Sequence, residues 1–369
     1  MLIAGQLLLG LVLLVAGGEV LVRGASALAA AFRISPLVIG LTVVAFGTSA
    51  PELGVSLQAA LTGNADVAIG NVVGSNIVNL LVVLGASAIV APLIVSSQLI
   101  RLDVPLMILA CIGMWVSSLD GVISRGEGAV MFVSLLVYIV YSIRASRRET
   151  VEVAEQAGEG AESGIKHLAI QAGLLIGGLV MLSFGARFLV EGAIAIATSL
   201  GVSQLVIGLT VVAVGTSLPE VVTSLVAAYR GQRDIAVGNV VGSNLFNVCC
   251  VAGLTSIAAP EGIPVGQQAI QFDLPIMVAV AVICFPVFCL GGVIKRFEGG
   301  LFLLYFGLYT AFLIVSSTDP ESTNEFGGTL LKIVVPLTIL TLGVSYWEGR
   351  RMKSRDGLDS AMSDEENRR

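Results

Sequence analysis

The sequence states one ten-residue phrase twice, each time inside a long apolar segment. Residues 43–52 read VVAFGTSAPE, and residues 211–220 read VVAVGTSLPE. Adding 168 to the residue number maps 35–85 onto 203–253 without a gap, and about 32 of those 51 positions are identical. Identity at a fixed internal offset indicates a duplicated architecture. The chain is therefore expected to fold as two related halves.

The composition indicates which kind of duplicated protein this is. Of 369 residues, 56% are hydrophobic and 12% are charged, and the mean hydropathy is +0.94. Apolar runs repeatedly reach the ~20 residues that a helix needs to cross a bilayer. We therefore predict an all-α polytopic membrane protein. The predicted spans are about 2–31, 36–61, 67–91, 104–119 and 128–143, then 168–200, 205–229, 235–259, 274–290 and 300–316, with an eleventh at 330–347.

The spans and the repeat together predict the domain organisation. Each half has five spans, an odd number, so the second half should enter the membrane from the opposite side, as in transporters with inverted repeats. The predicted parts are a first five-span repeat at 1–143 with its repeated core at 36–85, an acidic cytoplasmic linker at 144–167, a second five-span repeat at 168–316 with its core at 204–253, an external loop and eleventh span at 317–348, and a cytoplasmic tail at 349–369.

The distribution of basic residues predicts the orientation. Cytoplasmic loops of membrane proteins are enriched in Lys and Arg. With the N-terminus outside, only Arg125 and Lys332 fall in external segments. The predicted topology is N-out and C-in. The basic residues then placed in the cytoplasm are Arg33, Arg101, Arg144, Arg147, Arg148, Lys166, Arg230, Arg233, Lys295 and Arg296, together with those of the tail, among them Arg350, Arg351, Lys353 and Arg355.

The repeated phrase has the chemistry of a cation site. Glu52 and Glu220 lie within apolar segments, where a carboxylate is costly and marks a functional site by default. Pro51 and Pro219 lack an N–H group, so each helix should break there and expose backbone carbonyls. Carboxylates, hydroxyls and carbonyls are the hard oxygen ligands that Ca²⁺ prefers. The alternative is an acid hydrogen-bonded between helices. The hydroxyls beside the acids are those of Thr48, Ser49, Thr216 and Ser217.

A second motif, GNVVGSN, supplies further polar groups in the following span of each half. Ser75 and Asn79 are four residues apart, so they share one helix face, and Ser243 and Asn247 repeat the pattern. We expect these four side chains to line the site. The alternative is hydrogen bonding between helices, which polar residues in membranes commonly make. Asn76 and Asn244 lie off that face, and orientation of the site is their expected role.

Other charged residues favour local roles. Glu19 and Arg23, like Arg187 and Glu191, are four residues apart on predicted helices, with the signs exchanged between the halves. This spacing predicts two local ion pairs. Four aspartates stand just before or at the start of predicted spans, where helix N-capping would explain them. They are Asp66, Asp103, Asp234 and Asp273.

The paired motifs resemble a known family. GTSAPE with GNVVGSNIVN, and GTSLPE with GNVVGSNLFN, are similar to the α-repeats of the Na⁺/Ca²⁺ exchanger branch of the cation/Ca²⁺ antiporter superfamily, in its prokaryotic calcium/sodium antiporter form. The resemblance implies that Glu52 and Glu220 are shared Ca²⁺/Na⁺ ligands. At Asn247, some archaeal and K⁺-dependent relatives carry Asp, whereas amides at both central positions resemble the K⁺-independent exchangers, which implies that transport does not need K⁺. The remaining implied ligands are Thr48, Ser49, Thr216, Ser217, Ser75, Ser243, Asn79 and the carbonyls of Ala45 and Ala213.

The sequence therefore predicts a secondary active antiporter of the cell inner membrane, which exchanges Ca²⁺ for Na⁺ by alternating access. More than two Na⁺ per Ca²⁺ are expected, so exchange should carry charge. The expected partners are Ca²⁺, Na⁺ and the lipid bilayer, with no cofactor, no nucleic acid and no obligatory protein partner. The main alternative is a Ca²⁺/H⁺ exchanger in which Glu52 and Glu220 protonate. A channel and an intramembrane enzyme are less favoured, because the sequence shows broken helices with midplane acids and no nucleophile–base pair.

Overall fold

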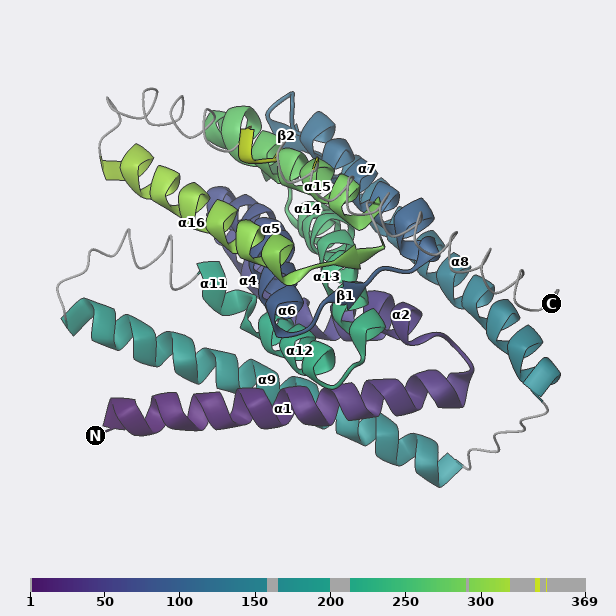
Figure 1. Cartoon of the computed structure of the whole chain (residues 1–369). Coiled ribbons are helices and arrows are strands. Elements are labelled where there is room, and N and C mark those ends of the chain that lie inside the picture. Colours follow the sequence, from purple (N-terminus) through teal and green to yellow (C-terminus); the bar gives the residue numbers. More distant parts are fainter. Residues whose placement is uncertain are drawn as a thin grey trace.

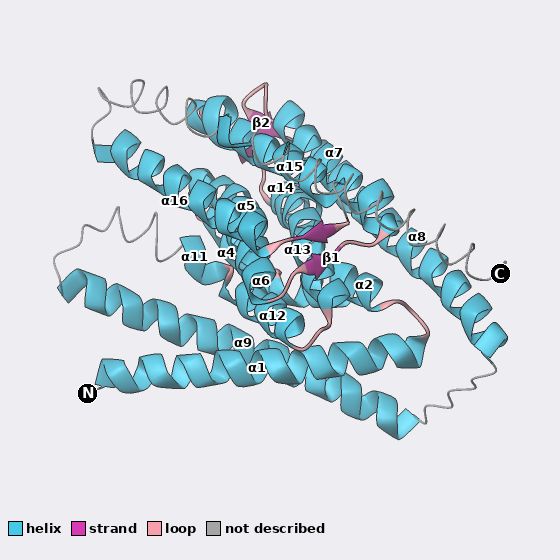
Figure 2. Ribbon diagram, in the orientation of Figure 1, coloured by secondary structure: helices cyan, strands magenta, loops and turns pink. Residues whose placement is uncertain are grey.

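The chain is mostly helical, as predicted. The computed structural model describes residues 2–157, 165–199, 213–289, 292–318, 336–338 and 343. Within these residues, helices form almost the whole structure, and the strands are two short pairs (Figure 2). In the part of the chain that the structure describes, eight helices are long and apolar enough to cross a membrane, and one bent pair makes a ninth candidate. The predicted eleventh span and tail lie almost entirely outside the described residues.

The first half consists of one long helix followed by segmented ones. Its α-helices and strands are α1 (Leu2–Phe32), α2 (Pro36–Ile39), α3 (Ala45–Thr48), α4 (Ala50–Leu61), α5 (Ala65–Val78), α6 (Leu84–Val90), β1 (Leu93–Ile94), α7 (Val104–Ser117), β2 (Val122–Ile123) and α8 (Arg125–Ala157). Three π-helical segments join these helices, namely η1 (Gly40–Val44), η2 (Asn79–Val83) and η3 (Leu99–Asp103).

The second half repeats this order where it is described. Its α-helices and strands are α9 (Ile165–Ser199), α11 (Ala213–Thr216), α12 (Leu218–Tyr229), α13 (Arg233–Leu245), α14 (Gly253–Ala258), β3 (Ile263–Pro264), α15 (Leu274–Cys289), β4 (Val293–Ile294) and α16 (Arg296–Thr318). Its π-helical segments are η5 (Phe246–Ala252) and η6 (Ala269–Asp273).

Equivalent contacts join the two halves. Strand β1 pairs antiparallel with β4, and β2 pairs antiparallel with β3, so each ladder takes one strand from each half. Glycines also allow helices of the two halves to approach closely. A methyl group at Gly85 of α6 would lie 2.8 Å from the Gly299 carbonyl oxygen of α16. One at Gly253 of α14 would lie 2.9 Å from the Gly128 carbonyl oxygen of α8. Small residues permit such close helix approach in membranes. The halves are therefore interlocked.

Helices α1 and α9 form a closely packed pair along one edge of the molecule (Figure 1). Their backbones meet at glycines: a methyl group at Gly10 would lie 2.9 Å from the Gly185 carbonyl oxygen, and one at Gly178 would lie 2.8 Å from the Gly17 carbonyl oxygen. The two predicted ion pairs on these helices, Glu19–Arg23 and Arg187–Glu191, are confirmed. Glu19 also binds Arg230, which follows α12, and so ties α1 to the rest of the structure.

Two features of the chain differ from the sequence-based expectation. The first part of the predicted linker is helical, because α8 continues without a break from the fifth span to Ala157. The prediction that aspartates cap helices is wrong for Asp66 and Asp234, which lie in the first turns of α5 and α13 and not at the N-cap. Asp103 occupies the N-cap of α7 but makes no capping bond, and it accepts a hydrogen bond from the Tyr138 hydroxyl at 2.9 Å.

Candidate functional site

The site begins at the break in the two phrase-bearing helices. Helix α3 ends at Thr48 and α4 starts at Ala50, with a bend of 43° between the two parts of the span. Ser49 takes φ −83° and ψ 3°, and Ser217, between α11 and α12, takes φ −87° and ψ 6°. Each proline stands in the first turn of the new helix, where its missing N–H costs nothing. The predicted break is confirmed in both halves.

The break places one acid in the first turn of each new helix. Glu52 of α4 and Glu220 of α12 are both 0% exposed, and the two carboxylates interact electrostatically. Each one also meets a serine from the other half. The Ser49 hydroxyl donates to Glu220 Oε1 at 3.3 Å, and the Ser217 hydroxyl donates to Glu52 Oε1 at 3.5 Å. The duplicated phrases therefore form a single site.

The second motif lines this site with polar atoms that the protein leaves unpaired. Asn79 starts η2, Asn247 lies in η5, and both are fully buried. Neither amide has a hydrogen-bond partner among the described residues, nor do Ser75 Oγ, Glu52 Oε2 and Glu220 Oε2. Buried polar groups are normally satisfied. Carboxylate, hydroxyl and amide oxygens without partners are suited to binding a hard cation.

Neighbouring polar residues point elsewhere, as their spacing predicted. The Asn76 amide donates to Met277 Sδ of α15 at 3.3 Å, and the Asn244 amide donates to the Val240 carbonyl at 2.9 Å. The Ala45 carbonyl, an expected ligand, accepts the Ser49 N–H at 3.0 Å and the Thr48 hydroxyl at 3.3 Å. It is therefore engaged within its own helix. Ala213 is the first described residue of α11.

Sequence reasoning missed two residues that border the site, Asn71 and Asn239. They occupy the same place in GNVVGSN, one turn before the serine that was singled out. The Asn71 amide nitrogen donates to the Glu52 carbonyl at 3.1 Å, and that of Asn239 donates to the Glu220 carbonyl at 3.4 Å. The signal was available in the motif, because both asparagines are identical between the repeats within predicted membrane spans.

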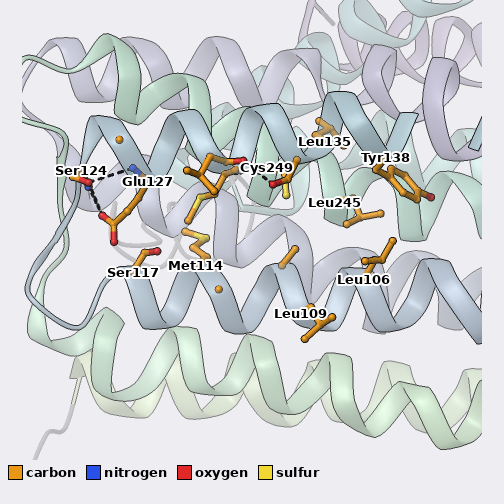
Figure 3. Close-up of a pocket in the computed structure, with 16 residues that line it drawn as sticks. Leu106, Leu109, Met114, Ser117, Ser124, Glu127, Leu135, Tyr138, Leu245 and Cys249 are labelled. Carbon is orange, nitrogen blue, oxygen red and sulfur yellow. Dashed lines mark hydrogen bonds between the residues drawn. The ribbon is translucent and has the colours of Figure 1, made fainter. Parts of the chain in front are cut away.

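A separate pocket lies away from this site. It has a volume of about 650 Å³ and lies between α7, α8 and the region of α13 and η5. Its lining includes Leu106 and Met114 of α7, Leu135 and Tyr138 of α8, and Leu245 and Cys249 (Figure 3). At one end Glu127 accepts the Ser124 N–H at 2.8 Å, which is the capping box of α8. None of the predicted ligands lines this pocket, which is mainly apolar.

The charge and ligand types of the site limit which ions it suits. Among the described residues, no three histidine, cysteine or acidic side chains gather at one place. The site instead offers two carboxylates with hydroxyl and amide oxygens around them. Zinc sites in proteins usually include cysteine sulfur or histidine nitrogen beside any carboxylate, whereas Ca²⁺ and Na⁺ are bound by oxygen ligands. Two buried like charges also repel each other, so binding a cation between them would stabilise the site.

Comparisons with known proteins indicate which family this chain is similar to. The family model described as sodium/calcium exchanger protein matches residues 2–144 and 170–315, which includes both repeated cores. The chain is 40% identical over 316 residues to the putative antiporter CaxA of Alkalimonas amylolytica, covering 84% of this chain and 98% of that protein. It is 32% identical to the sodium/calcium exchanger MaX1 of Methanosarcina acetivorans, over 84% of this chain and 97% of that one.

The fold agrees with a solved structure of the same kind. The sodium-calcium exchanger NCX_Mj, soaked with Na⁺ and Ca²⁺, superposes with a TM-score of 0.72 at 32% sequence identity. The match covers 86% of this chain and 99% of that one. Motifs, family model, relatives and fold all agree. The chain therefore belongs to the sodium/calcium exchanger family.

Proposed function

We propose that this protein is a secondary active antiporter that exchanges Ca²⁺ for Na⁺ across the inner membrane. The observation that carries the proposal is the placement of Glu52 and Glu220, both fully buried and each facing a serine of the other repeat. A buried pair of carboxylates is costly unless a cation neutralises it. Either one Ca²⁺ or several Na⁺ can neutralise the pair, but not both at the same time. This competition for shared ligands is the basis of antiport.

Neutral oxygens complete the proposed ion sites. The hydroxyls of Thr48, Ser49, Thr216 and Ser217, the side chains of Ser75, Ser243, Asn79 and Asn247, and the carbonyls of Ala45 and Ala213 surround the two acids in this proposal. They would hold Na⁺ without adding negative charge. With amides at both Asn79 and Asn247, the site has no third carboxylate, and transport should not need K⁺.

Alternating access would use the duplication. Two five-span repeats of opposite orientation, N-out and C-in overall with an eleventh span outside the repeat, would bring Glu52 and Glu220 to the bilayer midplane from opposite sides. The exchanged contacts between the halves support this topology, because each strand pair and each serine–glutamate pair takes one partner from each repeat. Rocking or sliding of one part against the other would then open the same site to either side.

Calcium uptake into proteoliposomes tests the proposal. Vesicles loaded with Na⁺ and diluted into Na⁺-free medium at equal internal and external pH should accumulate ⁴⁵Ca²⁺, and uptake should stop when an ionophore collapses the Na⁺ gradient. A pH gradient imposed without Na⁺ should drive no uptake. If only the pH gradient drives uptake, the protein is a Ca²⁺/H⁺ exchanger and the proposal is wrong.

A further inference from the structure

Asn71 and Asn239 connect each acid-bearing helix to a threonine of the opposite repeat. The Asn71 amide nitrogen binds the Glu52 carbonyl and Ser56 Oγ, the latter at 2.9 Å, and its Oδ1 accepts from the Thr216 hydroxyl at 3.4 Å. The second half repeats the pattern residue by residue: Asn239 binds the Glu220 carbonyl and Ser224 Oγ at 3.0 Å, and its Oδ1 accepts from the Thr48 hydroxyl at 3.1 Å.

The orientation of each amide follows from its acceptors. A backbone carbonyl can only accept a hydrogen bond, so the amide nitrogen has to face the Glu52 or Glu220 carbonyl. Its second hydrogen is directed at the serine oxygen, and the serine in turn approaches a backbone carbonyl in the same helix pair. Both donors are then used. The amide oxygen is fixed toward the threonine, and a reversed amide would set two acceptors against each other.

The fixed amide oxygen controls where the threonine hydrogen points. A hydroxyl has one hydrogen and two lone pairs, and only a lone pair can coordinate a cation. With its hydrogen directed at Asn Oδ1, the threonine keeps lone pairs for the site. The Thr48 hydroxyl also lies 3.3 Å from the Ala45 carbonyl oxygen and 3.4 Å from the Ser243 hydroxyl, but Asn239 Oδ1, at 3.1 Å, is nearer than either. Each asparagine therefore selects the hydroxyl orientation that suits ion binding.

From this geometry we propose that Asn71 and Asn239 are positioning residues for cation binding, each acting through the threonine of the other repeat. They touch no ion themselves. The inference rests on the proposed function, since it assumes that Thr48 and Thr216 are ligands. It goes further in two respects. Two asparagines orient those ligands, and each asparagine orients the threonine of the other repeat.

A pair of double-mutant cycles tests whether each asparagine acts through the threonine of the opposite repeat. Equilibrium binding of ⁴⁵Ca²⁺ to the purified full chain in detergent is measured for Asn71→Leu, Thr216→Val and their combination. Asn71→Leu alone should weaken Ca²⁺ binding about tenfold, the loss expected when a hydrogen bond that supports a charged group is removed. In the Thr216→Val background it should add less than a twofold loss, because no hydroxyl remains to orient.

Thr48→Val provides the matched control. Thr48 is the same residue type in the same phrase but binds Asn239, so Asn71→Leu should still cost about tenfold in that background. Equal losses in wild-type, Thr216→Val and Thr48→Val backgrounds would show a merely structural role and overturn the proposal, as would no loss in the wild-type background. If Asn71→Leu does not fold, by size exclusion and thermal unfolding, the cycle of Asn239→Leu with Thr48→Val decides in the same way.

The same measurement separates this inference from the proposed function. Wild-type protein that binds no Ca²⁺ would contradict the proposed function. Wild-type protein that binds Ca²⁺, and binds it more weakly in both Thr48→Val and Thr216→Val, would support the threonines as ligands. If both asparagine cycles then show no coupling, the positioning role alone is wrong.

Discussion

The two buried glutamates supply all of the negative charge that the proposed ion site contributes. Replacing either by glutamine keeps size and hydrogen-bonding capacity but leaves a divalent cation with one counter-charge in a water-poor site. We expect Glu52→Gln and Glu220→Gln each to weaken ⁴⁵Ca²⁺ binding by at least about 100-fold, the scale on which breaking a buried charge pair is costly.

The same substitution at a surface acid is the control for this prediction. Glu127 is partly exposed and caps α8, and glutamine can serve in a capping box as well. Glu127→Gln should therefore bind Ca²⁺ like the wild type. Substantial binding by a well-folded Glu52→Gln or Glu220→Gln variant would contradict the site assignment.

The prediction that transport does not need K⁺ rests on Asn247. It is an uncharged amide in η5, fully buried and without a partner among the described residues. Because an amide adds no charge to hold an extra monovalent ion, Na⁺-driven Ca²⁺ uptake should proceed at an unchanged rate when choline replaces K⁺ on both sides. Loss of exchange without K⁺ would refute this interpretation. Asn247→Asp should alter the ion dependence of transport more than it alters the melting temperature.

At the level of residues, the sequence predicted site residues where a residue type that is unusual in a membrane span recurs at equivalent positions of the two repeats. Glu52 and Glu220 could be singled out because a carboxylate in an apolar span is rare, and because each occurs beside a proline in both halves. Asn71 and Asn239 carried the same repetition, but an amide is not costly enough in a helix to attract notice by composition alone. Their role depends on which carbonyl and which threonine they reach, and those contacts join residues up to 191 positions apart.

The broken helices were predictable at the level of elements, and the π-helical segments were not. A proline identifies a break because it removes a donor at a known position. The wide turns at η2 and η5 have no such marker in the sequence. They begin at or one residue before the central asparagines Asn79 and Asn247, and π-helical turns often accompany functional sites because they redirect side chains.

The α1–α9 pair gives a prediction about elements. A methyl group at Gly178 would lie 2.7 Å from the Leu21 N atom, whereas one at the adjacent Gly177 meets nothing within 4 Å among the described residues. Gly178→Ala should therefore force the helices apart and lower stability by about 1–3 kcal/mol. Gly177→Ala should be neutral or slightly stabilising, since alanine favours helices by up to about 1 kcal/mol.

Thermal unfolding of the purified protein in detergent measures this difference. The Gly178→Ala variant should melt at a lower temperature than the wild type, and Gly177→Ala should not. Equal melting temperatures for the two variants would mean that the helix contact at Gly178 does not contribute to stability.

For the whole molecule, the excess of neutral oxygens over acids predicts charge movement. Two Na⁺ would neutralise Glu52 and Glu220 but leave many buried hydroxyl and amide groups unpaired, which is costly in a dry site. A further Na⁺ would satisfy them, so more than two Na⁺ should move per Ca²⁺. The membrane potential would then contribute about 2.3 kcal/mol per net charge per 100 mV.

A valinomycin-imposed potential measures that charge. Calcium uptake by Na⁺-loaded vesicles should rise when the interior is made positive, because Na⁺ exit then carries positive charge outward. If both the rate and the final level of uptake are indifferent to the potential, exchange is electroneutral and the argument from the neutral oxygens fails.

The most direct test of the central claim is the direction of calcium movement when the sodium gradient is reversed. Proteoliposomes that hold equal ⁴⁵Ca²⁺ inside and outside, at one pH and without ATP, are exposed to an outward or an inward Na⁺ gradient. If Glu52 and Glu220 are shared by the two ions, net Ca²⁺ should enter under the outward gradient and leave under the inward one. Net Ca²⁺ movement that keeps its direction and size under both gradients would contradict Ca²⁺/Na⁺ exchange.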